Sequence, residues 1–588
     1  MRCVRFILPL LLIAASIVRA QGSEPVSMKD PSTEIKAVKG YLEEVHKHLL
    51  HSYVFADKLT DPQLVKACAA GFTKALSDDK FAKVDDEVKD ALKEAFAEDH
   101  ESIAALLTTL KSTLKEHEVK SFPVVTLADA GAKAMVAQTG DPFSRIFDAE
   151  EIQKLQKQLS GEEKDDAIGI AVEPAKGGLR VSYVMYGTAA YDAGIQIGDQ
   201  ILTVNGREVK GMTEKELATV AKVKQGEKIE FGIRRSGWKK AIPFTLIQRS
   251  NQHDEVLYEM LPGGIGYMRI TMFPMPANLF GGGKGAFPAV GKALKALKKQ
   301  GMKALVLDLR YNPGGALQTV IPVADEFIGG DQLITKTETH LKLELPFKLP
   351  FNLPGMGEGD QEFMANTPSD FEELPMVTLI NGATASASEL LSGALQDLQR
   401  STLIGETSYG KGIGQSAVPL FSTSTLMGGG RGVDWGTGAS PFMPNRFLYL
   451  TVMKYYLPSG RSIHHKGVVP DVEVHNAQLD EATFRGVREL QATGAIAKYL
   501  DRNWEEHADA FAGIAAYDDY STDEYPGFAK FYAGLETGIS EDAVRGAVRE
   551  EIRHRVAEER KRPFLTDLED DAQLQTGVLL LQEKLEGK

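Results

Sequence analysis

One part of the chain alternates strands and helices in a regular order. Short apolar strands are expected at residues 305–309, 376–380 and 402–405. The first two are each followed by a turn, at residues 312–315 and 381–384, and then by an apolar helix. Consecutive strands joined by helical crossovers lie parallel in one sheet. Residues 255–475 are therefore predicted to form an α/β domain with a mostly parallel sheet.

The rest of the chain divides into regions of different texture. A chain of 588 residues is too long for one core, since domains usually hold about 100–200 residues. Residues 164–250 contain short apolar runs with glycine breaks and two short helical segments, a pattern typical of a compact sheet domain. Residues 34–160 and 476–588 carry apolar residues at helical spacing. The expected fold class is a multidomain α+β protein with helical N- and C-terminal regions.

Two stretches within the α/β domain have the composition of loops. Residues 341–368 contain four prolines, and residues 422–444 are rich in glycine. Both are expected to be exposed loops inserted between regular elements, because long segments of this composition rarely pack into a core. The sequence assigns neither insertion a role.

The first 20 residues have the pattern of a signal peptide. Basic residues precede an apolar run of about 13 residues, and a small residue occupies the cleavage site. An uncleaved membrane anchor is the alternative, but a spanning helix needs about 20 apolar residues. The protein is therefore expected to be exported, with a bacterial periplasm as the preferred location.

The composition excludes several classes of function. The formal net charge is −14, and loss of the three arginines of the leader changes it to −17, so nucleic acid is not expected as a partner. Of two cysteines only Cys68 lies outside the leader, which excludes an intrachain disulfide and a cysteine-rich zinc site. No His-Glu-x-x-His pattern occurs. Neither a metal nor a cofactor is expected.

Ser386 lies where the second predicted turn meets its helix. With Glu389 it forms a Ser-x-x-Glu capping box, and a capping role alone would account for it. However, a strand–turn–helix corner also places Ser386 at the carboxyl end of a parallel strand, where open α/β sheets build their sites. The helix N-terminus would favour developing negative charge. Ser386 is therefore a candidate nucleophile, provided that a base can remove its proton.

Lys411 is the candidate base. It follows the strand that leaves the Ser386 helix, so one crossover can bring it beside the serine. A lysine acts as a base only when burial lowers its pKa from about 10.4 toward neutrality, and the alternative is an exposed turn lysine. The amide of Gln415 could orient the ammonium group or the substrate. His464 and His465 lie in a polar run and are interpreted as surface residues.

These segments resemble the carboxy-terminal processing peptidases, also called tail-specific proteases. The resemblance rests first on residues 383–389 (ATASASE) and 405–415 (GETSYGKGIGQ). It extends to residues 266–270, 304–315, 454–463 and 466–471. The family implies a serine protease core at residues 255–475 with a ClpP/crotonase-like sheet and helical crossovers, and a PDZ domain inserted at residues 164–250.

The resemblance assigns roles to the residues that match the family motif. It implies that Ser386 attacks the peptide carbonyl, that Lys411 is the general base, and that Gln415 is the family's glutamine. Asp397 occupies a position where some members have a functionally sensitive aspartate. We interpret Asp397 as structural, because it lies well along the helix from the chemistry.

The resemblance also implies an oxyanion hole made of backbone N–H groups. One donor is expected from Gly314 or Gly315 in the Asn-Pro-Gly-Gly turn, and the other from Ala387, the residue after the nucleophile. Glycine allows a close approach of the backbone, and two fixed donors match a tetrahedral oxyanion.

Residues 164–250 resemble a PDZ domain. The residues that match its carboxylate-binding loop and strand are Ile168, Gly169, Ile170, Ala171 and Val172. The resemblance implies that N–H groups of this loop hold a free C-terminal carboxylate while the peptide adds as a strand. The expected partners are proteins or peptides with free, apolar C-termini.

Two functions remain open at this point. The first is an endopeptidase that binds substrate C-termini and hydrolyses peptide bonds through a Ser/Lys dyad. The second is a non-catalytic peptide-binding scaffold that retains the protease fold. The presence of Ser386, Lys411, Gln415 and the glycine turn in one chain favours the enzyme. The helical ends could bind an adaptor or dimerise the protein.

Overall fold

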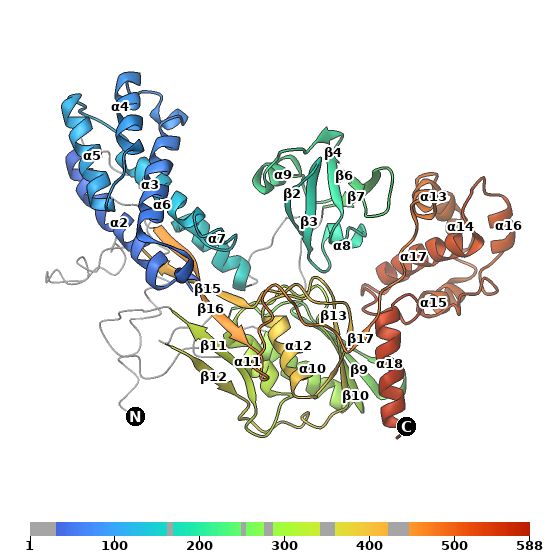
Figure 1. Cartoon of the computed structure of the whole chain (residues 1–588). Coiled ribbons are helices and arrows are strands. Elements are labelled where there is room, and N and C mark those ends of the chain that lie inside the picture. Colours follow the sequence, from blue (N-terminus) through green and yellow to red (C-terminus); the bar gives the residue numbers. More distant parts are fainter. Residues whose placement is uncertain are drawn as a thin grey trace, which may run out of the picture.

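The computed structural model describes residues 31–160, 168–248, 254–275, 286–340, 359–420 and 446–587. The predicted signal peptide and the predicted insertion at residues 422–444 lie outside the described residues. A helical N-terminal region, a small sheet domain, a central core and a C-terminal helical region succeed one another along the chain (Figure 1). No helix among the described residues combines the length and the apolar character needed to cross a membrane.

The N-terminal region is built from amphipathic helices. In α2 (Pro31–His51), the buried residues recur three or four positions apart, which gives the helix one apolar face. The Thr60–Gln63 capping box starts α3 (Asp61–Ala75). The other helices are α4 (Asp86–Ala97), α5 (Ile103–Glu116), α6 (Val124–Ala137) and α7 (Ala149–Ser160).

This region also contributes a strand that its helical pattern did not predict. Residues between α6 and α7 form β1 (Arg145–Asp148), which pairs antiparallel with β16 (Arg446–Tyr456) about 300 residues further along the chain. The helical prediction for residues 34–160 is therefore wrong at this strand. A four-residue strand has no detectable period of its own, so only its distant partner defines it.

The sheet domain holds a single antiparallel sheet with two short helices, as predicted. The order is β2 (Ile170–Ala175), β3 (Gly178–Val184), β4 (Gln200–Val204), β6 (Lys228–Arg234) and β7 (Ile242–Ile247), with β5 (Arg207–Glu208) beside β4. The helices are α8 (Ala189–Asp192) and α9 (Glu214–Val220). Side chains of β7 alternate between buried and exposed, because one face covers a separate apolar core.

The central sheet is mostly parallel, which confirms the prediction. Its order is β17 (Val472–Glu473), β14 (Thr402–Gly405), β13 (Met376–Ile380), β10 (Ala304–Asp308), β9 (Ile265–Ile270) and β8 (Val256–Leu261). The first five strands run parallel, and β8 is antiparallel to β9. Every residue of β9, β10 and β13 is buried, as expected for strands covered on both faces.

Helices cover the two faces of this sheet. Leu305 and Leu307 point into a cluster that includes α10 (Ala286–Lys299), α11 (Leu317–Asp325) and α12 (Ala387–Asp397). Val306, from the opposite face of β10, packs in a second cluster with α18 (Ala572–Leu585). The last helix of the chain therefore belongs to the core of the central domain.

A second, antiparallel sheet lies beside the first. Its strands are β1, β16, β11 (Leu333–Thr339), β12 (Gln361–Met364) and β15 (Ile413–Pro419). The loop predicted at residues 341–368 is wrong at its end, because residues 361–364 pair with β11. The remainder of that predicted loop up to residue 358 lies outside the described residues.

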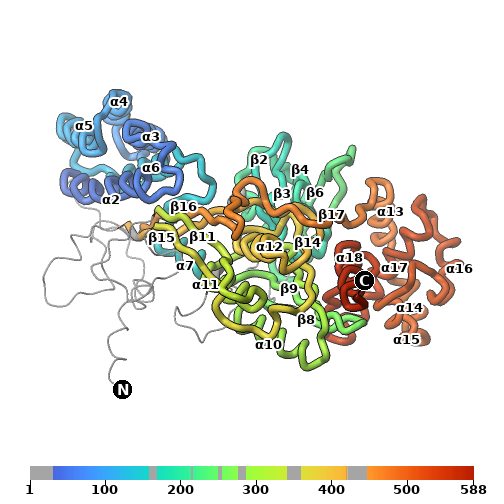
Figure 2. The backbone as a smooth tube through the Cα atoms, turned by 60° about the horizontal axis from the view of Figure 1, so that its bottom comes forward, coloured from blue at the N-terminus to red at the C-terminus, as the bar shows by residue number. Residues whose placement is uncertain are grey.

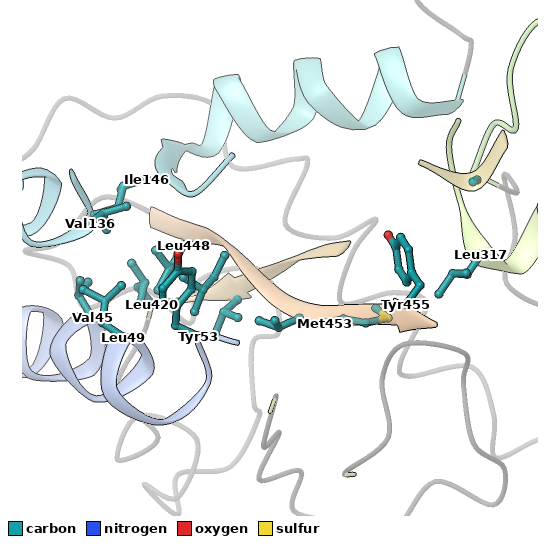
Figure 3. Close-up of a cluster of buried hydrophobic side chains, with 14 of the residues drawn as sticks. Val45, Leu49, Tyr53, Val136, Ile146, Leu317, Leu420, Leu448, Met453 and Tyr455 are labelled. Carbon is teal, nitrogen blue, oxygen red and sulfur yellow. The ribbon is translucent and has the colours of Figure 1, made fainter. Parts of the chain in front are cut away.

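Strand β16 joins the N-terminal helices to the central domain. Figure 3 shows Leu448 near its start among Val45, Leu49 and Ile146, while Tyr455 lies at its far end towards Leu317. One continuous apolar cluster therefore runs from the N-terminal helices into the core.

The C-terminal region has its own apolar core and contacts the sheet domain. Its helices are α13 (Glu481–Ala492), α14 (Ala495–Asn503), α15 (Ala508–Ala516), α16 (Phe528–Ala533) and α17 (Glu541–Glu559). Phe484 of α13 packs 5.0 Å, between ring centroids, from both Trp238 and Phe244 of the sheet domain. The backbone tube in Figure 2 shows these helices at the opposite end of the molecule from the N-terminal ones.

Candidate active site

Ser386 lies at the corner between β13 and α12. Its backbone has φ +57° and ψ −117°, a conformation that costs a non-glycine residue about 1–3 kcal/mol and that clusters at functional sites. The turn before it is fixed by side chains: the Thr384 hydroxyl donates to the Leu309 carbonyl over 2.9 Å. The Ala385 N–H donates to the Asn312 carbonyl over 3.0 Å. The two turns predicted from the sequence therefore lie side by side at the carboxyl ends of neighbouring strands.

Two glycines bring the neighbouring turn against Ser386. A Cβ on Gly314 would lie 2.7 Å from the nitrogen of Ala387 and 2.8 Å from the Cβ of Ser386. A Cβ on Gly315 would lie 1.8 Å from the carbonyl oxygen of Phe273. Both positions also have positive φ, at +93° and +144°. Only glycine fits here, and the close approach places the turn backbone beside the first N–H of α12.

The N–H of Gly314 is already used within its own turn. It donates to the Asn312 side-chain oxygen over 2.8 Å. Of the predicted oxyanion donors, Gly315 and Ala387 are therefore the better placed pair, since the first N–H groups of a helix lack intrahelical acceptors.

One carboxylate holds both loops of the site. Glu389 is fully buried, and its Oε2 accepts from the backbone N–H groups of Ser386 and Lys411, each over 2.8 Å. Its Oε1 accepts from the Ser408 hydroxyl over 2.5 Å and from the Gly410 N–H over 2.7 Å. Both backbone nitrogens lie 2.8 Å from the same oxygen atom, so the distance between them cannot exceed the sum of these two distances. The crossover predicted from the sequence does bring the two residues together.

Burial changes the basicity of Lys411. It lowers the pKa of the ammonium group to about 8, although the carboxylates of Asp141 and Glu389 raise it. The Nζ atom lies 4.4 Å from the centroid of the Phe143 ring. Lys411 is therefore not the exposed turn lysine of the alternative interpretation, and a useful fraction of it is neutral near pH 8.

The side chain of Ser386 lies beside the phenol of Tyr455. Burial raises the pKa of Tyr455, and the interaction with Ser386 opposes the rise. Among the described residues no hydrogen bond joins the Ser386 hydroxyl to the Lys411 amine. Catalytic hydrogen bonds are often formed only in the complex with substrate, so the pair is close but is not yet engaged.

Gln415 is linked to Asp141 through a hydroxyl group and does not contact Lys411 by a hydrogen bond among the described residues. Its amide donates to the Thr451 hydroxyl over 3.1 Å, and that hydroxyl donates to the Asp141 carboxylate over 2.6 Å. The predicted glutamine therefore supports Asp141, whose charge acts on the lysine.

Sequence reasoning missed Asp141, Phe143 and Tyr455. The first two follow α6, and β1 carries their segment to the site. Residues 139–142 (TGDP) have the composition of a turn, but nothing local indicates which distant segment they meet. Tyr455 lies on β16, in a stretch that was used only for the resemblance.

The structure also shows the surroundings of Asp397 and of the two histidines that were predicted to lie at the surface. Asp397 contacts Ser459 and Arg461, through a 3.0 Å hydrogen bond and a 2.8 Å ion pair, and so has structural partners. His465 is exposed, as predicted for a surface residue. His464 differs, because its ring stacks 5.9 Å from the Phe55 ring and burial lowers its pKa.

The predicted carboxylate-binding segment forms the edge of the small sheet. Ile168 and Gly169 precede β2, which holds Ile170, Ala171 and Val172 and has only β3 as a neighbour among the described strands. Gly169 has φ +82°, and a Cβ there would lie 2.1 Å from the Thr188 hydroxyl. An edge strand of this kind can accept a further strand.

The small sheet domain touches the rim of the site. The Tyr183 hydroxyl donates to the carbonyl of Tyr311 over 2.7 Å, and the rings of Tyr191 and Tyr311 lie 5.0 Å apart. Tyr311 directly precedes the Asn312–Gly315 turn. Within the described residues, no group of acidic, histidine or cysteine side chains is arranged to hold a metal ion.

Comparison with known proteins identifies the class. Peptidase family S41 matches residues 264–474, and the PDZ domain matches residues 156–234. A carboxyl-terminal-processing protease of Synechocystis sp. is 30% identical over 366 residues, which are 62% of this chain and 74% of that protein. The carboxy-terminal processing protease CtpA of Bacillus subtilis is 29% identical over 347 residues, or 59% of this chain and 64% of that protein.

A solved structure of a photosystem II D1 C-terminal processing protease aligns with 71% of this chain and 94% of its own, at 22% identity and a TM-score of 0.44. The sequence matches define a serine protease with a PDZ domain. The chain belongs to the carboxyl-terminal processing proteases of peptidase family S41.

Proposed function

We propose that this protease cleaves peptide bonds through a Ser386/Lys411 dyad and selects substrates by their C-termini. The observation that carries the proposal is the Glu389 carboxylate, which holds the backbone of both residues on a single oxygen atom. The lowered pKa of Lys411 fits a general base that works near neutrality.

The reaction follows from the positions of these groups. Neutral Lys411 takes the proton of the Ser386 hydroxyl as the serine oxygen attacks the substrate carbonyl carbon. The tetrahedral oxyanion accepts hydrogen bonds from the N–H groups of Gly315 and Ala387. The lysine then gives its proton to the leaving amine, and water hydrolyses the acyl-enzyme by the same route.

The PDZ domain supplies the selection. A substrate C-terminus adds as a strand to β2, and its carboxylate is held by the N–H groups near Gly169. The domain meets the active-site rim through Tyr183 and Tyr311, so a bound C-terminus lies on the same side of the molecule as the dyad. We expect apolar C-terminal side chains to pack against Ile170 and Val172, which are only partly buried at this edge.

The test uses the purified full chain and an unfolded polypeptide with an apolar C-terminus. Ser386→Ala and Lys411→Ala are each expected to lower kcat by at least about a hundredfold, because each removes a group that acts in the transition state. Ser392→Ala, six residues further along the chain on α12, and exposed Lys466→Ala are the matched controls. Amidation of the substrate C-terminus is expected to raise KM.

Three outcomes would contradict the proposal. Undiminished cleavage by Ser386→Ala would exclude the nucleophile, and cleavage by neither the variants nor the parent protein would favour the non-catalytic scaffold. Equal KM values for the free acid and the amide would exclude recognition of the C-terminal carboxylate.

A further inference from the structure

Strand β8 is the outermost strand of the central sheet. Among the described strands it pairs only with β9, which leaves its other edge without a strand partner. An open edge carries a row of backbone donors and acceptors that can template another strand, and proteins normally cover or interrupt such edges.

The register shows which groups face outward. The Thr271 N–H donates to the Glu255 carbonyl over 2.9 Å, so this is a hydrogen-bonded pair of the antiparallel ladder. Hydrogen-bonded and non-hydrogen-bonded pairs alternate, and the register from Val256 to Leu261 has no bulge. The N–H and C=O groups of Val256, Tyr258 and Met260 therefore point away from β9. These six groups have no hydrogen-bond partner among the described residues.

A cavity of about 1120 Å³ lies along this edge. Its lining includes Tyr258 and Met260 of β8, Tyr191 of the PDZ domain, and Phe564 and Thr566 of the C-terminal region. The C-terminal region is held here by a side-chain contact, from the Thr566 hydroxyl to Glu259 over 2.6 Å, and leaves the β8 backbone unpaired. Sites for small molecules usually measure about 300–1,000 Å³, so this cavity has room for a larger ligand.

The cavity reaches the rim of the active site. Tyr191, which lines the cavity, packs against Tyr311, which directly precedes the glycine turn beside Ser386. Arg269, another lining residue, lies on β9 next to the strand that ends in this turn. The lining of the cavity is therefore in contact with the rim of the active site.

We infer that the outer edge of β8 binds an extended segment of the substrate polypeptide as an added β-strand. The alternating donors and acceptors of Val256, Tyr258 and Met260 match a polypeptide backbone and require no particular side chains. The site is a second holding point, apart from the PDZ edge, for a substrate that is long and unfolded. The inference rests on the proposed function, because it takes the occupant to be the substrate.

Hydrogen exchange resolved to single amides tests this directly. The probe is the inactive Ser386→Ala full chain with an unfolded polypeptide of about 30 residues, since a strand rises about 3.4 Å per residue and the six residues of β8 span about 20 Å. The amides of Tyr258 and Met260 are expected to exchange fast in the free protein and to become protected when the polypeptide is added. The amides of Leu257 and Glu259, which pair with β9, are the internal control and stay slow throughout.

Two results would overturn the inference. One is fast exchange at Tyr258 and Met260 at saturating polypeptide. The other is protection that appears without polypeptide and grows with protein concentration, which would assign the edge to a second copy of this chain.

A proline at position 258 provides an independent measurement. Tyr258→Pro removes one outward N–H, and proline is tolerated on an edge strand when its missing N–H faces away from the sheet. The ratio of kcat/KM for the long polypeptide to that for a short peptide with the same C-terminus is expected to fall about fivefold to tenfold. Tyr258→Ala keeps the N–H and is expected to keep the ratio.

An unchanged ratio in a folded Tyr258→Pro variant would overturn the inference, while hydrolysis of the short peptide would continue to support the proposed function. Loss of all hydrolysis in the parent protein would instead count against the proposed function. If Tyr258→Pro does not fold, the exchange measurement on Ser386→Ala decides the question.

Discussion

Two fully buried carboxylates lie in the central domain, and their surroundings differ. Asp308 accepts from the guanidinium groups of Arg269, over 2.5 Å, and Arg310, over 2.7 Å. Burial opposes ionisation of Asp308, but these two cations hold its pKa well below the usual range. Glu389 accepts only from neutral N–H and O–H groups, and burial raises its pKa.

The charged centre joins parts of the protein that are distant in sequence. Arg310 also pairs with Asp571 at the start of α18, over 2.6 Å. Arg269 also lies 4.1 Å from the ring centroid of Tyr186 in the PDZ domain. The Asp308 network therefore connects the central sheet with the C-terminal helix and the PDZ domain.

The neutral centre has a different use. The donors to Glu389 come from the Ser386 corner and from residues 408–411, so the carboxylate positions the two reacting residues through neutral donors. A guanidinium group at this place would lower the pKa of Lys411 further, because like charges repel. The comparison indicates that charged partners fix the domains to one another, whereas neutral partners fix the reacting groups.

Removal of the Asp308 charge is expected to have the largest effect, and this effect is on stability. Asp308→Asn should lower the free energy of unfolding by about 3–5 kcal/mol, because it leaves the buried guanidinium group of Arg269 without a counterion and that of Arg310 with Asp571 alone. Urea denaturation measures this. Asp370→Asn is the control: Asp370 forms an exposed ion pair with Lys298 over 2.7 Å, and no measurable change is expected. Equal midpoints for the two variants would contradict the prediction.

Glu389→Gln should affect both activity and stability. The amide matches the carboxylate in shape but directs an NH₂ group at two donors, so we expect a loss of about 1–3 kcal/mol in unfolding free energy. We also expect kcat to fall at least about tenfold, since 1 Å displacements of reacting groups cost about this much or more. The measurements are urea denaturation and peptide hydrolysis, with exposed Glu473→Gln as control.

The two variants together separate an effect on stability from an effect on catalysis. Asp308→Asn should spare kcat in the molecules that remain folded, whereas Glu389→Gln should lower it. A fall in kcat for Asp308→Asn alone would reverse the roles assigned to the two carboxylates.

Local sequence patterns predicted the parts of this site that local structure builds. The apolar strands indicated the parallel sheet, and the Ser-x-x-Glu pattern indicated that Ser386 caps a helix next to Glu389. The hydrogen bonds from residues 408–411 to Glu389 could not be predicted, because they depend on how this loop returns to the helix. A capping box describes four residues, and the site needs the path of the whole crossover.

Long-range contacts were beyond the reach of these patterns. Arg310 and Asp571 are 261 residues apart, and β1 pairs with a strand about 300 residues away. Nothing near Asp141 in the sequence therefore indicates that its charge acts on Lys411. No period or motif within one segment specifies which distant segment it will meet.

The smallest expected effect concerns the pH dependence of activity. Only neutral Lys411 accepts a proton, so kcat/KM should rise with pH and reach half its limit near the lysine pKa of about 8. The charge of Asp141 raises this pKa, so Asp141→Asn should move the rise to lower pH, while exposed Glu150→Gln should leave it in place. The folded pKa lies below the value of about 10.4 for an unfolded lysine, so the folded protein binds fewer protons between those two pH values. Lys411 should therefore make stability increase with pH across that window. A rise that stays in place or moves to higher pH in Asp141→Asn would show that this carboxylate does not act on the base.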